Sequence, residues 1–238
     1  MNTALIFAGG TGQRMNSRSK PKQFLELHGK PIILYTLERF EEHPEIDNIV
    51  VVCLESWINQ LNTVINRYDI KKVQLIIPGG DTGHESIYNG LKALEGVCRP
   101  DDIILIHDGV RPMVTRELIT ANINTVRKYG TAITAEPATE SIISSENGDL
   151  INSVPPRNSM FTAKAPQSFY YGLIWDLYQK ARHDGLLTVD SAHLLSIYGK
   201  EMHMVKSSSY NIKITTPADY YIFRALYEAM ENQQIFGL

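Results

Sequence analysis

The stretch TALIFAGGTGQRM at residues 3–15 decides the fold. Its apolar part, residues 3–8, has the length and the residue types of a buried β-strand. Three glycines follow at once, and backbone N–H groups without a neighbouring Cβ can approach an anion closely. The stretch lacks the Gly-Lys-Ser/Thr ending of a P-loop and the third glycine of the dinucleotide fingerprint. It therefore predicts a strand followed by another kind of phosphate-binding loop, formed by Ala8, Gly9, Gly10, Thr11 and Gly12.

Two positive charges lie beside this predicted loop. Arg14 is the next-to-last residue of the stretch, and Lys22 follows after a short polar segment, within Pro21-Lys22-Gln23. Fixed cations next to a glycine-rich loop are suited to the oxygen atoms of a phosphate group. The alternative is an ordinary turn with solvated charges. The strand before the loop favours the phosphate site.

Short apolar runs alternate with helical patterns through the first 136 residues. The predicted strands are 3–8, 46–53, 72–77, 102–107 and 131–136. The predicted helices are 31–42, 56–68, 85–94 and 117–129, with apolar residues three and four positions apart. This alternation predicts an α/β fold of the Rossmann type: a mostly parallel sheet with helices on both faces and ligands at the carboxyl ends of the strands.

The pattern changes after residue 136. The turn signal Glu146-Asn147-Gly148-Asp149 predicts an excursion with a β-hairpin between residues 141–143 and 150–151. Helical patterns return at 172–182 and 191–198, followed by a strand at 203–206, an apolar segment at 211–214 and a helix at 217–232. We expect one domain over residues 1–238, with a protruding arm at about 137–163. The aromatic residues at 169–171 and at 220, 221, 223 and 227 are expected to pack in a core or an interface.

The composition excludes several classes of protein. The 238 residues are 43% hydrophobic and 21% charged, with a net charge of −3, as in ordinary globular domains. The longest apolar runs are too short to span a membrane, and no basic block suggests nucleic-acid binding. The N-terminus has no export signal, which predicts a cytoplasmic protein. Cys53 and Cys98 are expected to be reduced thiols.

Seven blocks in the same order resemble the polyol-phosphate cytidylyltransferases, which have the nucleotide-diphospho-sugar transferase fold. The blocks lie at residues 8–15, 21–23, 78–81, 107–112, 155–157, 165–167 and 211–215. One branch of this family makes CDP-methylerythritol and the other makes CDP-ribitol. The resemblance implies CTP as a substrate, Mg²⁺ as a cofactor, and a polyol phosphate that attacks the α-phosphorus of CTP and releases pyrophosphate.

The resemblance also implies roles for residues outside the first loop. It places Asp108 on the metal, Arg111 near the substrate and the cytosine near Gly80, Asp81 and Ser86. It assigns Arg157 and Lys213 to the substrate phosphate and, with Arg14 and Lys22, to catalysis. Since the family's arm enters the neighbouring site, a homodimer is implied.

Other interpretations remain open for several of these residues. Asp108 and Arg111 suit a turn with an ion pair, Ser86 suits a helix cap, and Arg157 suits a solvated loop charge. His107 is expected to be a packed residue at a strand end. The chain also departs from the family at Gly83, which His84 follows and where relatives commonly carry an Arg, and at Ser141 and Ala165, where they usually carry Thr.

These departures leave three functions open. The first is a cytidylyltransferase of 2-C-methyl-D-erythritol 4-phosphate or D-ribitol 5-phosphate, with the departures leaning away from the methylerythritol branch. The second is a transferase that uses another nucleotide and a sugar phosphate. The third is an inactive nucleotide-binding module.

Overall fold

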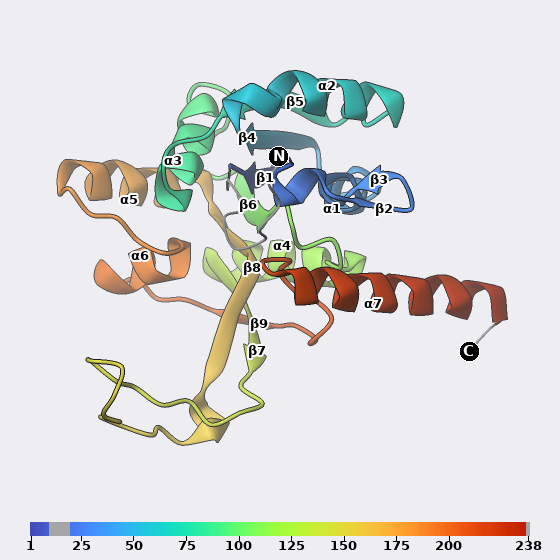
Figure 1. Cartoon of the computed structure of the whole chain (residues 1–238). Coiled ribbons are helices and arrows are strands. Elements are labelled where there is room, and N and C mark those ends of the chain that lie inside the picture. The colour runs from blue at the N-terminus through green and yellow to red at the C-terminus, as the bar shows by residue number, and fades with distance from the viewer. Residues whose placement is uncertain (10–19, 237–238) are drawn as a thin grey trace.

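A seven-stranded sheet forms the centre of the computed structural model, which describes residues 1–9 and 20–236 (Figure 1). The strands, in spatial order, are β5 (Val73–Pro78), β4 (Asn48–Cys53), β1 (Asn2–Ala8), β6 (Ile103–Asp108), β8 (Phe161–Tyr170), β7 (Thr131–Pro137) and β9 (Met204–Lys206). The first four are parallel, β8 runs antiparallel to β6 and β7, and β9 is parallel to β7. The predicted mostly parallel α/β fold is therefore confirmed.

Helices cover both faces of this sheet because alternate residues of its strands point to opposite sides. On β1, Ala4 and Ile6 pack in one core with α1 (Ile32–Glu41), α2 (Ile58–Arg67) and α4 (Arg116–Tyr129). Leu5 belongs to the other core, with α3 (Gly83–Ala93), α5 (Tyr171–His183) and α6 (Ser191–Ile197). Each predicted helix is present, with ends displaced by a few residues.

The last helix, α7 (Pro217–Phe236), covers a third, smaller core beside α1. The Phe223 ring is fully buried and meets the edge of Tyr35, with ring centres 5.4 Å apart. Tyr220 and Tyr227 are partly buried against the same core, as predicted. Tyr221 is 66% exposed, so it does not pack in the core of this chain, and its packing in an interface stays a prediction. The short elements β2 (Glu26–Leu27), β3 (Lys30–Pro31) and the 3-10 helices Lys22–Phe24, Glu55–Trp57 and Arg157–Ser159 complete the fold.

Strand β8 is the main element that the pattern of the sequence does not reveal. It contains Lys164, Gln167 and Ser168, and its Pro166 cannot donate a backbone hydrogen bond. The sheet accommodates this proline through a shift in register, since Ile133 pairs with Gln167 whereas Ala135 pairs with Ala163. Pairing to two neighbours, rather than an alternating apolar pattern, defines this strand.

Residues between β7 and β8 form the arm, which leaves the sheet and extends away from the body (Figure 1). Beyond the last β7–β8 pair, the predicted hairpin is reduced to a single bridge between Ser144 and Ser153. Its turn is as expected: Gly148 has a φ of +83°, and the Asn147 side chain accepts hydrogen bonds from the N–H groups of Asp149 and Leu150. An isolated two-stranded ribbon gains little from pairing alone, which explains the irregular backbone.

Both cysteines are buried and free, as predicted. Burial raises the pKa of each thiol to about 11, so both are protonated at neutral pH. Among the described helices, none combines the length and the apolar composition needed to cross a membrane.

Candidate active site

Two cavities meet at the carboxyl edge of the sheet. The first, of about 450 Å³, is lined by the end of β1, the 3-10 helix at Lys22, and the loop between β5 and α3. The second, of about 260 Å³, is lined by β8, the start of α6 and Arg111. Asp108 and Lys213 line both cavities. Two ligands bound in these cavities would therefore face each other across these two side chains.

Glycines allow two loops to come together in the first cavity. A Cβ on Gly9 would lie 3.0 Å from the Ser86 hydroxyl oxygen, and one on Gly80 would lie 2.4 Å from the Cβ of Glu85. The Gly80 N–H donates a hydrogen bond of 3.2 Å to the Ser86 Oγ. A side chain at Gly9 would push the two loops apart, and one at Gly80 would clash with Glu85 within the loop between β5 and α3. The structure thus brings together Ala8, Gly9, Gly80, Asp81 and Ser86, which the sequence predicts at one nucleotide site.

Thr82, not Ser86, begins helix α3. The Thr82 Oγ1 accepts a 3.1 Å hydrogen bond from the Glu85 N–H, and a Glu85 carboxylate oxygen accepts one of 3.0 Å from the Thr82 N–H. This is a capping box, and it turns the positive end of α3 toward the first cavity. The alternative interpretation of Ser86 as a cap is therefore wrong. The spacing Thr-x-x-Glu is the sequence signal that would have identified the cap.

Lys22 lines the first cavity from the side opposite α3. Its neighbour Gln23 is 1% exposed and donates a 2.6 Å hydrogen bond to the carbonyl of Ala8. Phe24 stacks on Trp57, with ring centres 4.6 Å apart. These contacts fix Lys22 relative to the end of β1. The other predicted residues of this loop, Gly10, Thr11, Gly12 and Arg14, lie outside the described residues.

Asp108 is the centre of a buried charge cluster. Its carboxylate meets the Arg111 Nε at 2.8 Å and the Lys213 Nζ at 2.5 Å. Burial by itself raises the pKa of this carboxyl, but the positive charges of Lys213 and Arg111 outweigh burial and hold the pKa at about 2. The carboxylate is ionised at neutral pH, so it holds both cations where the two cavities meet.

Arg111 is used mainly to join segments of the chain. Besides the ion pair with Asp108, its Nη1 donates a 2.9 Å hydrogen bond to the Asn211 carbonyl. The Asn211 side chain then donates one of 2.7 Å to the Ala165 carbonyl on β8. The ion pair expected in the alternative interpretation is present, and Arg111 also lines the second cavity. Asn211, 1% exposed, positions this site, a role that the sequence pattern did not assign to it.

Arg157 lies on the arm, apart from Lys213. It is exposed, lines neither cavity, and makes a 3.4 Å hydrogen bond to the Thr139 carbonyl within the arm. Within one chain, the structure does not bring together the two cations that the family resemblance assigns to the substrate phosphate.

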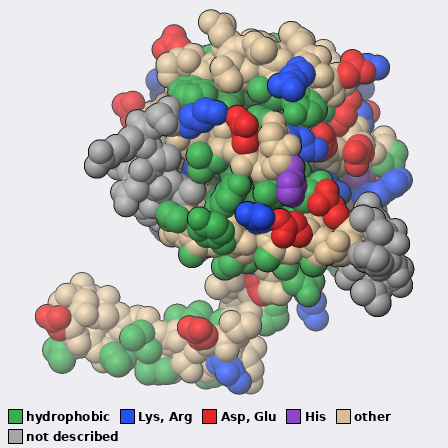
Figure 2. Space-filling model, turned by 45° about the vertical axis from the view of Figure 1, so that its right-hand side comes forward, with side chains coloured by type: hydrophobic (Ala, Val, Ile, Leu, Met, Phe, Trp, Pro, Cys, Tyr) green, Lys and Arg blue, Asp and Glu red, His purple; other side chains and the backbone are tan. Residues whose placement is uncertain are grey.

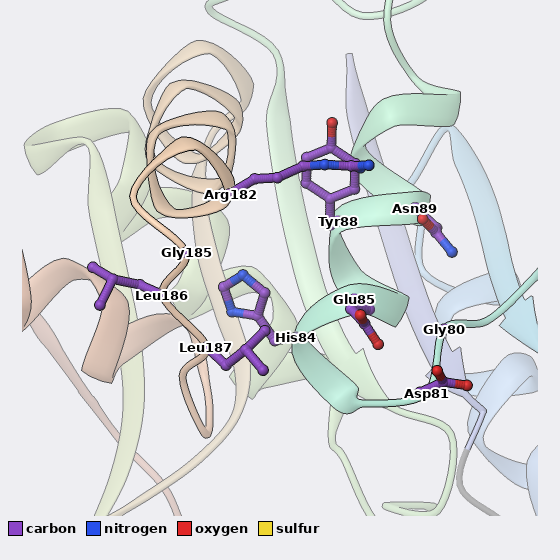
Figure 3. Close-up of a pocket in the computed structure, with 10 residues that line it drawn as sticks. All are labelled: Gly80, Asp81, His84, Glu85, Tyr88, Asn89, Arg182, Gly185, Leu186 and Leu187. Carbon is purple, nitrogen blue, oxygen red and sulfur yellow. The ribbon is translucent and has the colours of Figure 1, made fainter.

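A third cavity, of about 400 Å³, lies on the other side of the Gly80–Asp81 loop, between α3 and the connection from α5 to α6 (Figure 3). His84 points toward this connection: its ring is 5% exposed, packs on Tyr178, and accepts a hydrogen bond from the Thr188 N–H. Burial lowers the pKa of His84. The His84 side chain, next to the departure at Gly83, links two segments of the fold.

His107 is fully buried, as expected for a packed residue at a strand end. Its Nε2 donates a hydrogen bond to the Arg111 carbonyl, and its ring lies 5.1 Å from that of Phe40. Burial lowers the pKa of His107 to about 4, so the ring is neutral at pH 7.

Comparisons with known proteins identify the family of this chain. Residues 2–228 match the 2-C-methyl-D-erythritol 4-phosphate cytidylyltransferase family. The chain is 48% identical to a ribitol-5-phosphate cytidylyltransferase of Vibrio parahaemolyticus, with the whole of both chains covered. It is 39% identical to a 2-C-methyl-D-erythritol 4-phosphate cytidylyltransferase of Clostridium botulinum, over 96% of this chain and 98% of the other.

A solved structure gives the same result for the fold. The 4-diphosphocytidyl-2C-methyl-D-erythritol synthase of Anaerococcus prevotii superposes with a TM-score of 0.82 and 27% identity, over 95% of this chain and 96% of that one. This likeness in fold agrees with the family match over residues 2–228. The chain belongs to the polyol-phosphate cytidylyltransferase family and is a CTP-dependent nucleotidyltransferase.

Proposed function

We propose that this enzyme transfers CMP from CTP to D-ribitol 5-phosphate and releases pyrophosphate. The observation that carries the transfer is the position of Asp108 and Lys213, which line both cavities. The observation that favours ribitol is the higher identity to the ribitol-5-phosphate enzyme, 48% over the whole chain, against 39% for the methylerythritol enzyme.

The reaction requires alignment and neutralisation of charge rather than a covalent intermediate. An oxygen of the substrate phosphate attacks the α-phosphorus of CTP, and the bond from that phosphorus to the oxygen bridging to the β-phosphorus breaks. Gly9, Gly80 and Ser86 shape the site for the nucleotide. Lys22 neutralises charge on the triphosphate. Arg14, which lies outside the residues that the structure describes, has the same role in this proposal. Lys213, held by Asp108, directs the substrate phosphate toward the α-phosphorus.

Asp108 is the residue that would hold Mg²⁺. It lies where the two cavities meet, and one carboxylate with phosphate oxygens and waters is a usual ligand set for this ion. The described residues include no cluster of three or more acidic, His or Cys side chains, so the nucleotide would have to supply other ligands. When bound, the ion would neutralise charge on the triphosphate.

The arm supports a homodimer with shared sites. Its apolar side chains Leu150, Ile151 and Val154 are 70%, 60% and 59% exposed, and hydrophobic side chains lie along it in Figure 2. Exposed apolar residues on a protruding segment are typical of an interface. In this proposal the arm packs on a second copy and brings Arg157 to the phosphate held there by Lys213.

Pyrophosphate release from CTP tests the proposal. D-ribitol 5-phosphate and 2-C-methyl-D-erythritol 4-phosphate are compared at equal concentrations, with UTP, ATP and GTP as alternative nucleotides. We expect kcat/KM to favour ribitol phosphate with CTP by at least about 100-fold, or about 2.7 kcal/mol. A preference for the methylerythritol substrate would assign the other branch. Binding of CTP without turnover of either substrate would contradict the proposed activity.

A further inference from the structure

His84 joins the start of helix α3 to residues 184–190, which connect α5 to α6 (Figure 3). Its Nδ1 accepts a 3.3 Å hydrogen bond from the Thr188 N–H and lies 3.0 Å from the Thr188 hydroxyl oxygen. Thr188 is 8% exposed, and its hydroxyl also meets the Asp190 carbonyl oxygen at 3.1 Å. Burial lowers the pKa of His84, which keeps the ring neutral at pH 7, as an accepting Nδ1 requires.

The segment that His84 holds forms one wall of the second cavity. Residues 189–191 line that cavity and follow Thr188 directly. Gly83, which precedes His84 in α3, lines the same cavity. The hydrogen bond from Thr188 to His84 therefore helps to set how far this wall lies from α3.

The two sides of this link differ in their support. Helix α3 is fixed by its capping box and by Ile87, which is buried in the core that contains Leu5 of β1. The connecting segment is held less firmly: Val189 is 86% exposed, and of residues 187–189 only Thr188 hydrogen-bonds to another segment within the described part of the chain. Loss of the link should therefore move the connecting segment and leave α3 in place.

Such a movement would alter the second cavity and spare the first. The part of the first cavity that α3 contributes consists of residues 80–83 and Ser86, and residues 184–190 do not line it. In the second cavity, the wall at residues 189–191 lies in the same cavity as Asp108 and Lys213. A shift of this wall would change the space beside these two charged side chains.

We propose that His84 is a positioning residue for the polyol phosphate. By holding Thr188, it fixes the wall at residues 189–191 and so aligns the substrate in the second cavity with the α-phosphorus of CTP. This inference rests on the proposed function, which requires the polyol phosphate to bind in the second cavity. His84 lines neither the first nor the second cavity, so it acts through Thr188 and not by touching a substrate.

Two substitutions separate this role from a purely structural one. His84→Phe keeps a ring against Tyr178, which His84 contacts with ring centres 4.7 Å apart, but it cannot accept from the Thr188 N–H. His84→Asn loses the ring but places an amide oxygen near the position of Nδ1. We expect the KM for D-ribitol 5-phosphate to rise at least about fivefold in His84→Phe and less than about twofold in His84→Asn, as for loss and retention of one hydrogen bond. The KM for CTP should be unchanged in both.

A purely structural role predicts the opposite order, because lost ring packing would then cost more than one lost hydrogen bond. An effect of His84→Asn equal to or larger than that of His84→Phe would overturn the proposal. The matched control is His43→Phe. His43 is 1% exposed, accepts a 3.2 Å hydrogen bond from the Glu45 N–H and lines neither cavity. A rise in the KM for the polyol phosphate as large as in His84→Phe would also overturn the proposal.

Hydrogen exchange followed by mass spectrometry tests the link without any substrate. A peptide that contains residues 186–190 should exchange faster in His84→Phe than in the wild type, because the Thr188 N–H loses its acceptor. Unchanged exchange would show that His84 does not hold the connecting segment. Faster exchange with an unchanged KM for the polyol phosphate would show that this segment does not position the substrate. Either result overturns the proposal.

The wild-type enzyme distinguishes failure of the proposed function from failure of the role given to His84. A wild type that does not use D-ribitol 5-phosphate would contradict the proposed substrate, and the KM comparison would then use the polyol phosphate that is accepted. A His84→Phe enzyme with an unchanged KM for ribitol phosphate, beside a wild type that turns it over, would contradict only the role of His84.

Discussion

Arg111 and Arg157 are chemically identical side chains in opposite settings. Arg111 is 8% exposed and bound to Asp108 and Asn211, so its position is fixed within one chain. Arg157 is exposed on the arm, where its guanidinium donates a 3.4 Å hydrogen bond to the Thr139 carbonyl. Breaking a buried ion pair leaves an uncompensated charge away from water, whereas an exposed arginine gains little from a single neutral contact. The contacts of Arg111 are complete in a single chain, whereas we propose that Arg157 finds its partners on another copy of the chain.

The largest expected effect of this difference is on stability. Arg111→Met should lower the free energy of unfolding by about 3–5 kcal/mol, because it leaves the buried Asp108 carboxylate with one cation fewer. Arg157→Met should change it by less than about 0.5 kcal/mol, as for an exposed surface residue. Urea denaturation measures both. Equal losses would contradict the contrast between the two arginines.

A large effect on catalysis is expected at the junction of the cavities. Lys213→Ala should lower kcat/KM by about 10²–10³-fold, as for a lost group that stabilises charge in the transition state. Lys206→Ala, on an exposed strand, is the control. The assay is pyrophosphate release with CTP and ribitol phosphate. A variant with near-normal kcat/KM would show that Lys213 does not position the reacting phosphate.

A mixture of two inactive variants tests whether the arm completes a neighbouring site. Arg157→Ala and Lys213→Ala, coexpressed so that subunits mix, should regain about a quarter of wild-type activity, because half of the dimers would be mixed and each would hold one intact site. Lys22→Ala mixed with Lys213→Ala should regain none, since both residues line the first cavity of the same chain. Recovery in neither mixture would contradict the shared site.

The smallest expected effect is on how the free energy of unfolding depends on pH. It arises outside the arm, because the arm contains no histidine. His43 is 1% exposed, and burial lowers its pKa. The unfolded chain therefore binds a proton more readily than the folded chain. The stability that results is fully present above the ordinary His pKa of about 6.5 and is lost as the pH falls toward the lower pKa of the folded state. The loss is about 1.4 kcal/mol for each tenfold difference in proton affinity between the two states.

Urea denaturation at pH 7 and pH 5 measures this effect. His43→Gln should lose less stability than the wild type between the two pH values, because its side chain does not bind a proton in this range. An equal loss of stability in the variant and the wild type would show that His43 does not cause the pH dependence.

Several features could be predicted because neighbouring residues encode them. The apolar run before Gly9 predicts β1, the helical spacings predict the helices on both faces, and two isolated cysteines predict free thiols. The glycines after β1 predict a loop that other groups can approach closely, and Gly9 does lie against Ser86 of the loop between β5 and α3. Thr82 could also have been found from the capping-box spacing.

Other features depend on pairing that no local pattern contains. Strand β8 mixes apolar and polar residues without regular alternation and contains a proline, and it becomes a strand because β6 and β7 pair with both of its edges. Without that strand, the ion pair between Lys164 and Glu136 could not be predicted. The use of Arg111 to bind Asn211 likewise depends on where the segment after β9 returns to the site.

The sequence by itself determined the type of fold, the loops at the carboxyl edge and the family, because each depends on short-range spacing and on blocks of adjacent residues. Tertiary structure decided which charges meet. It placed Lys213 on Asp108, buried Arg111 as a connection between segments, and left Arg157 on an exposed arm. The physical reason is that ion pairs and desolvation depend on distances in space, and chain folding sets these distances between residues far apart in sequence.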